Sequence, residues 1–370
     1  MGYRTGVDGH AETAHQRHQS PPRADDPTID LTGGEARVTT RRATEPALAG
    51  PLPATASASG TRRISAVIGA EQVRDLHRER PLYDAVAFST LWVAAIALAV
   101  AIGSSGFGVV WALAFVAQGF LLQVFGYFAH DAFLHRRVGG SQWSRLGGLA
   151  CNAVLFLPFT DYVHLHGVHH RMANTVDDSE EYKRDFNRRW VKLTLLTAIG
   201  TKLSWSGAFR NTERPAWAPD YSAEEERHLR QENRVVVLWL LAVIVLAFLF
   251  PRIVLIGYIL PLVLVTPIAS TIRVVLEHAD VNLDNPLHIA TAYRTGPISG
   301  LVFLYGAGDC HLVHHLYPGI PFYNMPRALK LIRPILRSEG VAERRSLLGL
   351  LYGWMVLNKA HGTDWRQSQP

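Results

Sequence analysis

Four long apolar runs dominate the chain between about Ala85 and Val275. A helix needs roughly 20 predominantly apolar residues to cross a bilayer core of about 30 Å. Each run approaches that length, and polar or turn-forming residues separate the runs. The sequence therefore predicts an all-α integral membrane protein with four transmembrane helices, at about Ala85–Ile102, Phe107–Phe128, Val235–Phe250 and Ile253–Ile272.

Short turns divide the four runs into pairs. The first pair is joined by the uncharged stretch Gly103–Gly106 and the second by Pro251-Arg252. We therefore expect two helical hairpins, with both chain termini on one side of the membrane. A further apolar stretch, Leu149–Phe159, is too brief to cross and is predicted to be re-entrant or buried.

The flanking regions are polar. Residues 1–62 hold almost no large apolar side chains, which is typical of a disordered tail. Ile64–Arg80 alternates apolar and charged residues at helical spacing and predicts an interfacial helix. We expect three regions: the tail at 1–62, a membrane domain at 63–345, and a C-terminal amphipathic segment and tail at 346–370.

Charge gives the expected orientation. The net charge is +6, but residues 1–60 hold six Arg against seven Asp and Glu, so no basic arm for nucleic acid is present. Arg252 is the only basic residue in the two short turns, whereas many arginines flank the other helix ends. The positive-inside rule makes that side cytoplasmic. These arginines are Arg74, Arg78, Arg80, Arg136, Arg137, Arg145, Arg227, Arg230 and Arg234.

The lysine, cysteine and histidine contents bear on the location and the chemistry of the protein. Only five of the 37 basic residues are lysine, a pattern typical of a GC-rich bacterial genome and hence of an inner-membrane location. The two cysteines, Cys151 and Cys310, form neither a disulfide framework nor a CxxC motif. By contrast, the chain has 17 histidines.

Nine histidines follow metal-site spacing on the predicted cytoplasmic side. They form an HxxxxH, two HxxHH boxes and a single histidine where the fourth span ends. They are His130 and His135; His166, His169 and His170; His311, His314 and His315; and His278.

Helical geometry shows how these boxes can act. Positions i, i+3 and i+4 share one helix face, so each HxxHH can direct three imidazoles to one place. His130 and His135 are about 140° apart on an ideal helix, which fits either two different ions or a distorted helix end. Nine imidazoles exceed the shell of one ion, so at least two metal ions are predicted. His164 is expected to be local polar structure.

Neighbouring carboxylates are candidates for hydrogen-bond acceptors that orient the ligands. Three other metal chemistries fit the sequence less well. The chain has no HExxH motif of a zinc protease, and its predicted spans hold no histidine pairs that could bind haem. A zinc transporter would need polar ligands along a path through the apolar spans. A non-enzymatic metal or haem protein of the membrane stays the alternative from another class. The candidate carboxylates are Asp131, Glu277, Asp280 and Asp309.

The order of these boxes around two pairs of spans resembles the membrane fatty acid desaturase and hydroxylase superfamily. Gly308–Pro318 with Ile320–Pro326 is similar to the third box and its following segment, and His170–Thr175 with Asp177-Asp178 to the segment after the second. The resemblance covers roughly residues 80–340. It implies a non-haem di-iron centre held by the three boxes and one additional histidine, for which His278 is in the right place.

The resemblance also implies the reaction. We expect an O2-dependent desaturase that introduces a C=C bond into an acyl chain or a similar amphiphilic substrate. The alternatives are a hydroxylase or ketolase of the same superfamily, or a desaturase of a small metabolite such as dihydrorhizobitoxine. No HPGG motif of a fused cytochrome b5 is present, so electrons are expected from a separate, ferredoxin-like donor.

Overall fold

The computed structural model describes residues 56–173, 220–278, 285, 287–292, 310–341 and 352. All regular elements within these residues are helices, which confirms the all-α prediction. Four stretches are long and apolar enough to cross a membrane, as the sequence predicts. They are Ala70–Ser104, Val109–His135, Ala223–Leu249 and Arg252–Ser270.

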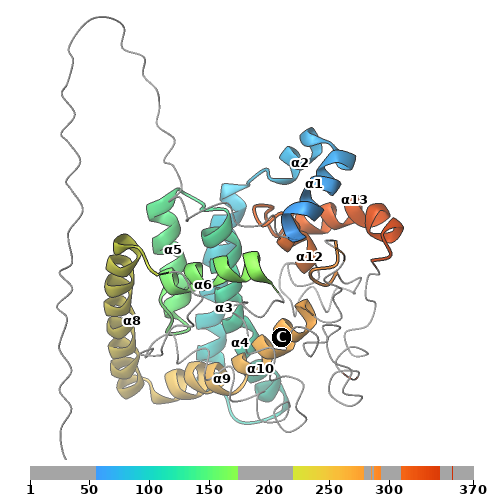
Figure 1. Cartoon of the computed structure of the whole chain (residues 1–370). Coiled ribbons are helices and arrows are strands. Elements are labelled where there is room, and N and C mark those ends of the chain that lie inside the picture. The colour runs from blue at the N-terminus through green and yellow to red at the C-terminus, as the bar shows by residue number, and fades with distance from the viewer. Residues whose placement is uncertain are drawn as a thin grey trace, which may run out of the picture. The chain divides into compact units, whose positions relative to one another are not determined.

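The first two apolar helices agree closely with the sequence (Figure 1). Helix α3 spans Pro81–Ser104 and begins with a proline, which suits the first helical position because no backbone donor is needed there. Helix α4 spans Val109–Phe128 and continues directly into η1, a π-helix over Ala129–His135. The intervening turn covers residues 105–108, two residues later than the expected Gly103–Gly106, because α3 continues to Ser104.

The third apolar helix begins earlier than predicted. Helix α8 spans Ala223–Leu249, with polar first turns that the hydropathy pattern did not include. The Ser222 side chain accepts from the Glu225 backbone N–H, and the Glu225 carboxylate accepts from the Ser222 N–H. This capping box, with three acidic residues in the first turn, starts the helix well before its apolar part.

The fourth run is a chain of helical pieces rather than one regular helix. It consists of the π-helix η3 (Arg252–Ile259), α9 (Leu260–Leu264) and α10 (Thr266–Glu277). Pro261 and Pro267 lie in the first turns of α9 and α10. Because proline lacks a backbone N–H, it interrupts the regular ladder at each place.

The region before the first span forms two helices. The predicted helix over Ile64–Arg80 is divided at Gly69, whose φ of 83° ends α1 (Ala56–Ile68) before α2 (Ala70–Leu76). Helix α1 includes residues before 62 that were expected in the tail; the tail before residue 56 lies outside the described residues.

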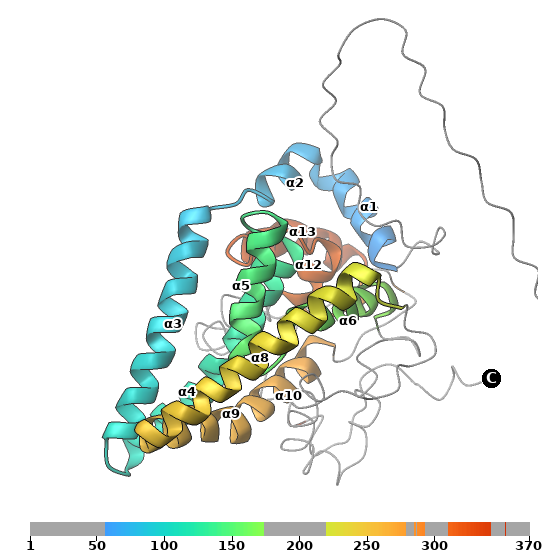
Figure 2. The ribbon, with the colours of Figure 1, turned by 90° about the vertical axis from the view of Figure 1, so that its left-hand side faces the viewer.

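Close packing joins the apolar helices. Ile253 lies directly against Gly103, and the backbone of Ala99 against Gly257, so α3 and η3 approach without intervening side chains. Thr266 donates its hydroxyl to the Gly119 carbonyl at 2.9 Å, which joins α10 to α4. In Figure 2 the end of α3, the start of α4 and the end of α8 lie together at the lower left.

The opposite end of the helices carries the remaining elements. These are α5 (Ser141–Ala153), α6 (Phe159–Met172), α12 (His311–Leu316) and α13 (Met325–Ser338). The stretch Leu149–Phe159 forms the end of α5, a turn and the start of α6, within the buried core. The C-terminal segment expected at 346–370 lies outside the described residues apart from Tyr352.

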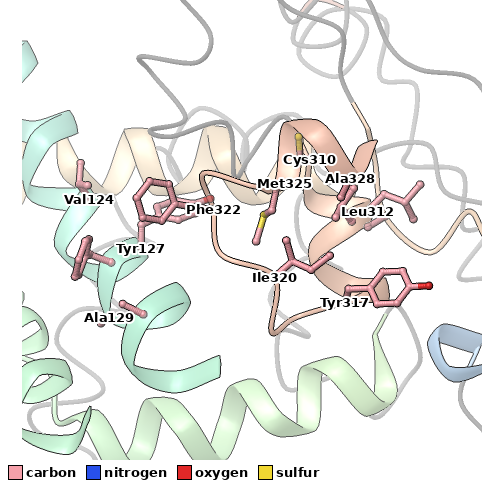
Figure 3. Close-up of a cluster of buried hydrophobic side chains, with 14 of the residues drawn as sticks. Val124, Tyr127, Ala129, Cys310, Leu312, Tyr317, Ile320, Phe322, Met325 and Ala328 are labelled. Atoms are coloured by element: carbon pink, nitrogen blue, oxygen red, sulfur yellow. The ribbon is translucent and has the colours of Figure 1, made fainter. Parts of the chain in front are cut away.

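The third-box segment is tied to the N-terminal helices. Thr61 of α1 donates to the Leu316 carbonyl at 2.6 Å, and the Ser65 hydroxyl lies 2.8 Å from the Tyr317 hydroxyl. Asn324 donates to the Leu76 carbonyl at 2.9 Å. Figure 3 shows side chains of this segment in a cluster of buried apolar residues that also includes the end of α4. These contacts fix α12 relative to the membrane helices.

Candidate metal centre

The nine predicted histidines all lie together, in two groups. Within each group, one nitrogen from every imidazole lies within 4.8 Å of one nitrogen of every other member. The five-histidine group is His130, His135, His166, His170 and His314. The four-histidine group is His169, His278, His311 and His315.

A π-helix brings the two histidines of the first box together. In η1 the Arg136 N–H bonds the Asp131 carbonyl five residues back, at 3.3 Å. This i to i+5 pattern places residues five apart on one face, where a regular α-helix would separate them. The ring centroids of His130 and His135 are 4.7 Å apart, and both belong to the five-histidine group. Of the two interpretations the sequence left open, the distorted helix end agrees with this geometry.

The two HxxHH boxes divide their histidines between the groups in opposite ways. In α6, His166 and His170 join the five-histidine group while His169 joins the other. In α12, His311 and His315 join the four-histidine group while His314 crosses to the first. Since each box serves both groups, the two candidate sites share their supporting helices.

His278 completes the four-histidine group from the end of α10. Its Nε2 lies 2.9 Å from Nε2 of His311. Thr291 connects the two: its N–H and hydroxyl donate to the Glu277 carbonyl at 2.9 and 2.8 Å, and its own carbonyl accepts from the Leu312 N–H at 3.0 Å. No local sequence pattern marks Thr291, because the two helices that it bridges are distant in the chain.

The spacing of the ring nitrogens fits metal coordination. Imidazole nitrogens bind first-row metals at about 2.0–2.1 Å, so neighbouring ligands of one ion lie about 3 Å apart. His130 Nε2 lies 2.7 Å from His166 Nε2, and His170 Nε2 lies 2.9 Å from His314 Nε2. His135 Nε2 is buried and has no hydrogen-bond partner in the described part of the chain.

Hydrogen bonding between imidazoles accounts poorly for the second group. His311 Nε2 lies 2.9 Å from His278 Nε2 and 3.1 Å from His315 Nε2. One ring nitrogen carries either one proton or one lone pair, so it cannot make a full hydrogen bond to both. Three nitrogens directed at a shared cation are the simpler account, and the imidazole set suits iron among other transition metals.

Comparison with known proteins agrees with this geometry. The family model for fatty acid desaturases matches residues 119–346, which include all nine histidines. The chain belongs to the fatty acid desaturase family. No individual curated protein matches it.

In this family member, burial favours the neutral form of two of the imidazoles. Burial, together with the neighbouring imidazoles, lowers the pKa of His166 and of His314 well below the ordinary value of 6.5. Neutral imidazole is the form that binds a metal ion. The rings of His166 and His314 are therefore in their metal-binding form at neutral pH.

One of the four candidate carboxylates lies beside a predicted ligand. Glu277 Oε1 is 3.4 Å from His311 Nδ1, and it accepts from Tyr127 Oη and Arg273 Nε at 2.5 Å each. Neither partner was predicted from the sequence. Arg273 is four residues before Glu277 in α10, a spacing visible in the sequence, whereas Tyr127 comes from α4 and only the fold brings it there.

Asp131 has a different neighbour. Its carboxylate accepts from Arg136 Nε at 3.0 Å, and Arg136 also donates to both carboxylate oxygens of Asp84 at 2.8 and 2.9 Å. This buried cluster joins the start of α3 to the end of η1. The orienting role of Asp131 stays a prediction, and Asp280 and Asp309 lie outside the described residues.

His164 lies apart from both groups. Although it is on α6 with the second box, its Nδ1 lies 3.5 Å from Glu225 Oε1 and its ring packs on Tyr221, with centroids 4.4 Å apart. The same helix therefore presents the box to the centre and His164 to the start of α8.

Proposed function

We propose that this protein is an O2-dependent desaturase that holds two non-haem iron ions, one at each histidine group. The observation that carries the proposal is the division of nine histidines into two groups within the matched family region. Bound iron would supply the O2-dependent oxidant for an unactivated C–H bond, which no side-chain acid or base can break at neutral pH.

The protein's own residues would hold and orient the metal. The buried imidazoles offer nitrogen lone pairs. The Glu277 carboxylate is placed to accept a hydrogen bond from Nδ1–H of His311 and so to direct Nε2 of that ring toward the metal. Glu277 is itself held by Tyr127 and Arg273. Asp131, Asp280 and Asp309 are proposed to orient other imidazoles in the same way.

The substrate is proposed to be an acyl chain or a similar amphiphile. The histidine groups lie beside the ends of the apolar helices, so a molecule could enter from the lipid while its head group stays at the interface. The overall reaction converts –CH2–CH2–, O2, two electrons and two protons into –CH=CH– and two waters. The two electrons require a separate donor, proposed to be a small ferredoxin-like carrier.

The proposed setting is a bacterial inner membrane, with 63–345 as the membrane domain. The Arg252 side chain donates to the Ser105 carbonyl at 2.9 Å, which supports the two short turns lying together at one end. The flanking arginines support a cytoplasmic location for the histidines and both termini. An alkaline phosphatase fusion at the Gly103–Gly106 turn should be active and a C-terminal fusion inactive; the reverse pattern would contradict this orientation.

Labelled dioxygen tests the reaction. The purified protein should contain about two iron ions per chain, and turnover should require an added electron-transfer chain. A desaturase releases the label as water and yields an alkene. Label retained as a hydroxyl or carbonyl would instead identify the hydroxylase or ketolase alternative, and a Soret band without non-haem iron would identify a haem protein.

A further inference from the structure

The carboxylate of Glu232 is completely buried, with an exposed fraction of 0%. It lies in the third turn of α8, on the side that faces α6. A carboxylate in such a place is costly unless it is paired and hydrogen-bonded. Its contacts therefore show what it does in the fold.

In the part of the chain that the structure describes, the hydrogen bonds of this carboxylate go to the first residues of α6. Glu232 Oε2 accepts from the backbone N–H groups of Phe159 at 2.9 Å and Thr160 at 2.7 Å. Its Oε1 accepts from the Thr160 hydroxyl at 2.8 Å. Arg145 of α5 adds a cation at 3.6 Å from Oε1.

Helix α6 has no cap of its own. Its N-cap residue is Pro158, which makes no side-chain capping bond. The first N–H groups of any helix lack partners within it, and the helix dipole concentrates positive charge there. Glu232 satisfies two of these donors and complements that charge from a different helix.

Helix α6 carries His166, His169 and His170 within about three turns of this end. Its position and rotation therefore set where three of the nine imidazoles point. The five-histidine group receives two histidines from α6 and the four-histidine group only one. A small displacement of α6 should accordingly disturb the five-histidine group more.

We propose that Glu232 is a positioning residue that caps α6 from α8 and so holds the second histidine box in register with the five-histidine group. This inference rests on the proposed metal centre. It makes α8 more than a lipid-facing helix, because its buried carboxylate connects that helix to the candidate active site.

The test compares Glu232→Gln with wild-type protein in detergent, with Co2+ as the probe because its absorption reports ligand geometry. The substitution would place an amide N–H where a carboxylate oxygen now accepts a hydrogen bond. We expect Co2+ binding at the five-histidine group to weaken about tenfold or more, with altered absorption, while the other group changes little. His135→Ala and His278→Ala, each removing a ligand of one group only, assign the two sets of bands.

The matched control is Glu226→Gln, earlier on α8, where an exposed carboxylate pairs with Arg230 at 3.3 Å. It should leave both Co2+ sites unchanged. Equal weakening of both sites in Glu232→Gln, or no change in either, would overturn the proposal.

Thr160→Val provides a second test of the capping role of Glu232 if the Glu232→Gln protein does not fold. It removes one of the three donors to Glu232 and keeps both backbone bonds, so Co2+ should dissociate faster from the five-histidine group alone. Dissociation from both groups at wild-type rates would overturn the proposal. If His135→Ala and His278→Ala each retain both ions, the metal centre itself is wrong, independently of Glu232.

Discussion

The rings of His130 and His135 lie with centroids 4.7 Å apart although the two residues are five positions apart in one helix. The π-helix over Ala129–His135 produces this arrangement. It continues α4 directly, so the first box projects from the end of a membrane-spanning segment. The first pair of imidazoles is thus fixed by the same helix that anchors the protein in the membrane.

Removing one histidine from each group should remove one metal ion. His135→Ala should lower the bound iron from about two to about one per chain, and His278→Ala should do the same at the other group. Turnover should be lost in both, since the proposed reaction needs both ions. Elemental analysis of the purified variants measures the first effect, and product analysis measures the second.

His164→Ala provides the control for these variants, because His164 lies on the same helix as the second box but contacts Glu225 and Tyr221. It should keep both ions and most of the activity. Loss of iron from His164→Ala equal to that from His135→Ala would contradict the assignment of the two groups.

Breaking the buried charge cluster should destabilise the fold. The Arg136 side chain is 1% exposed and pairs with Asp84 and Asp131. Arg136→Ala would leave two buried carboxylates without their cation, at a cost of about 3–5 kcal/mol in the free energy of unfolding. Arg230→Ala, which breaks an exposed pair with Glu226, should cost about 0.5 kcal/mol or less. Unfolding in mixed micelles compares them; equal costs would argue against the cluster.

A methyl group at Gly257 should separate two spans. A Cβ at this position would meet the backbone of Ala99 in α3, which cannot move aside as a side chain can. Gly257→Ala should lower the unfolding free energy by about 1–3 kcal/mol, as overpacking does. Gly108→Ala is the matched change, because a Cβ there meets nothing within 4 Å. A similar effect of both substitutions on thermal unfolding in detergent would contradict this packing.

Both thiols should be unreactive in the folded protein. Cys151 and Cys310 are buried and form no disulfide within the described residues, and burial raises the pKa of the Cys151 thiol above its ordinary value of 9.0. Because the thiolate is the reactive form, a raised pKa leaves less of it at about pH 8. Iodoacetamide should label neither cysteine before unfolding and both afterwards, as mass spectrometry would show. Labelling of Cys151 in native protein would show that this end of α5 is open to solvent.

The apolar spans and the nine candidate ligands could be predicted from the sequence alone. Both depend on local periodicity: a run of apolar residues has to span the bilayer core, and HxxHH has to share one helix face. Glu277 is a candidate from the sequence because it precedes His278 in the chain, whereas its contact with His311 comes from the fold. The matched family region includes all nine histidines and Glu277.

How these parts combine depends on contacts between elements that are distant in the chain. Whether His130 and His135 serve one group or two depended on a change of helix type that spacing alone left open. The division of each HxxHH box between two groups depends on how α6 and α12 face each other. Glu232 and Thr291 carry no local signal, because their partners are distant in the chain. A buried polar group needs a partner from whichever element the fold brings beside it, and sequence periodicity does not contain that choice.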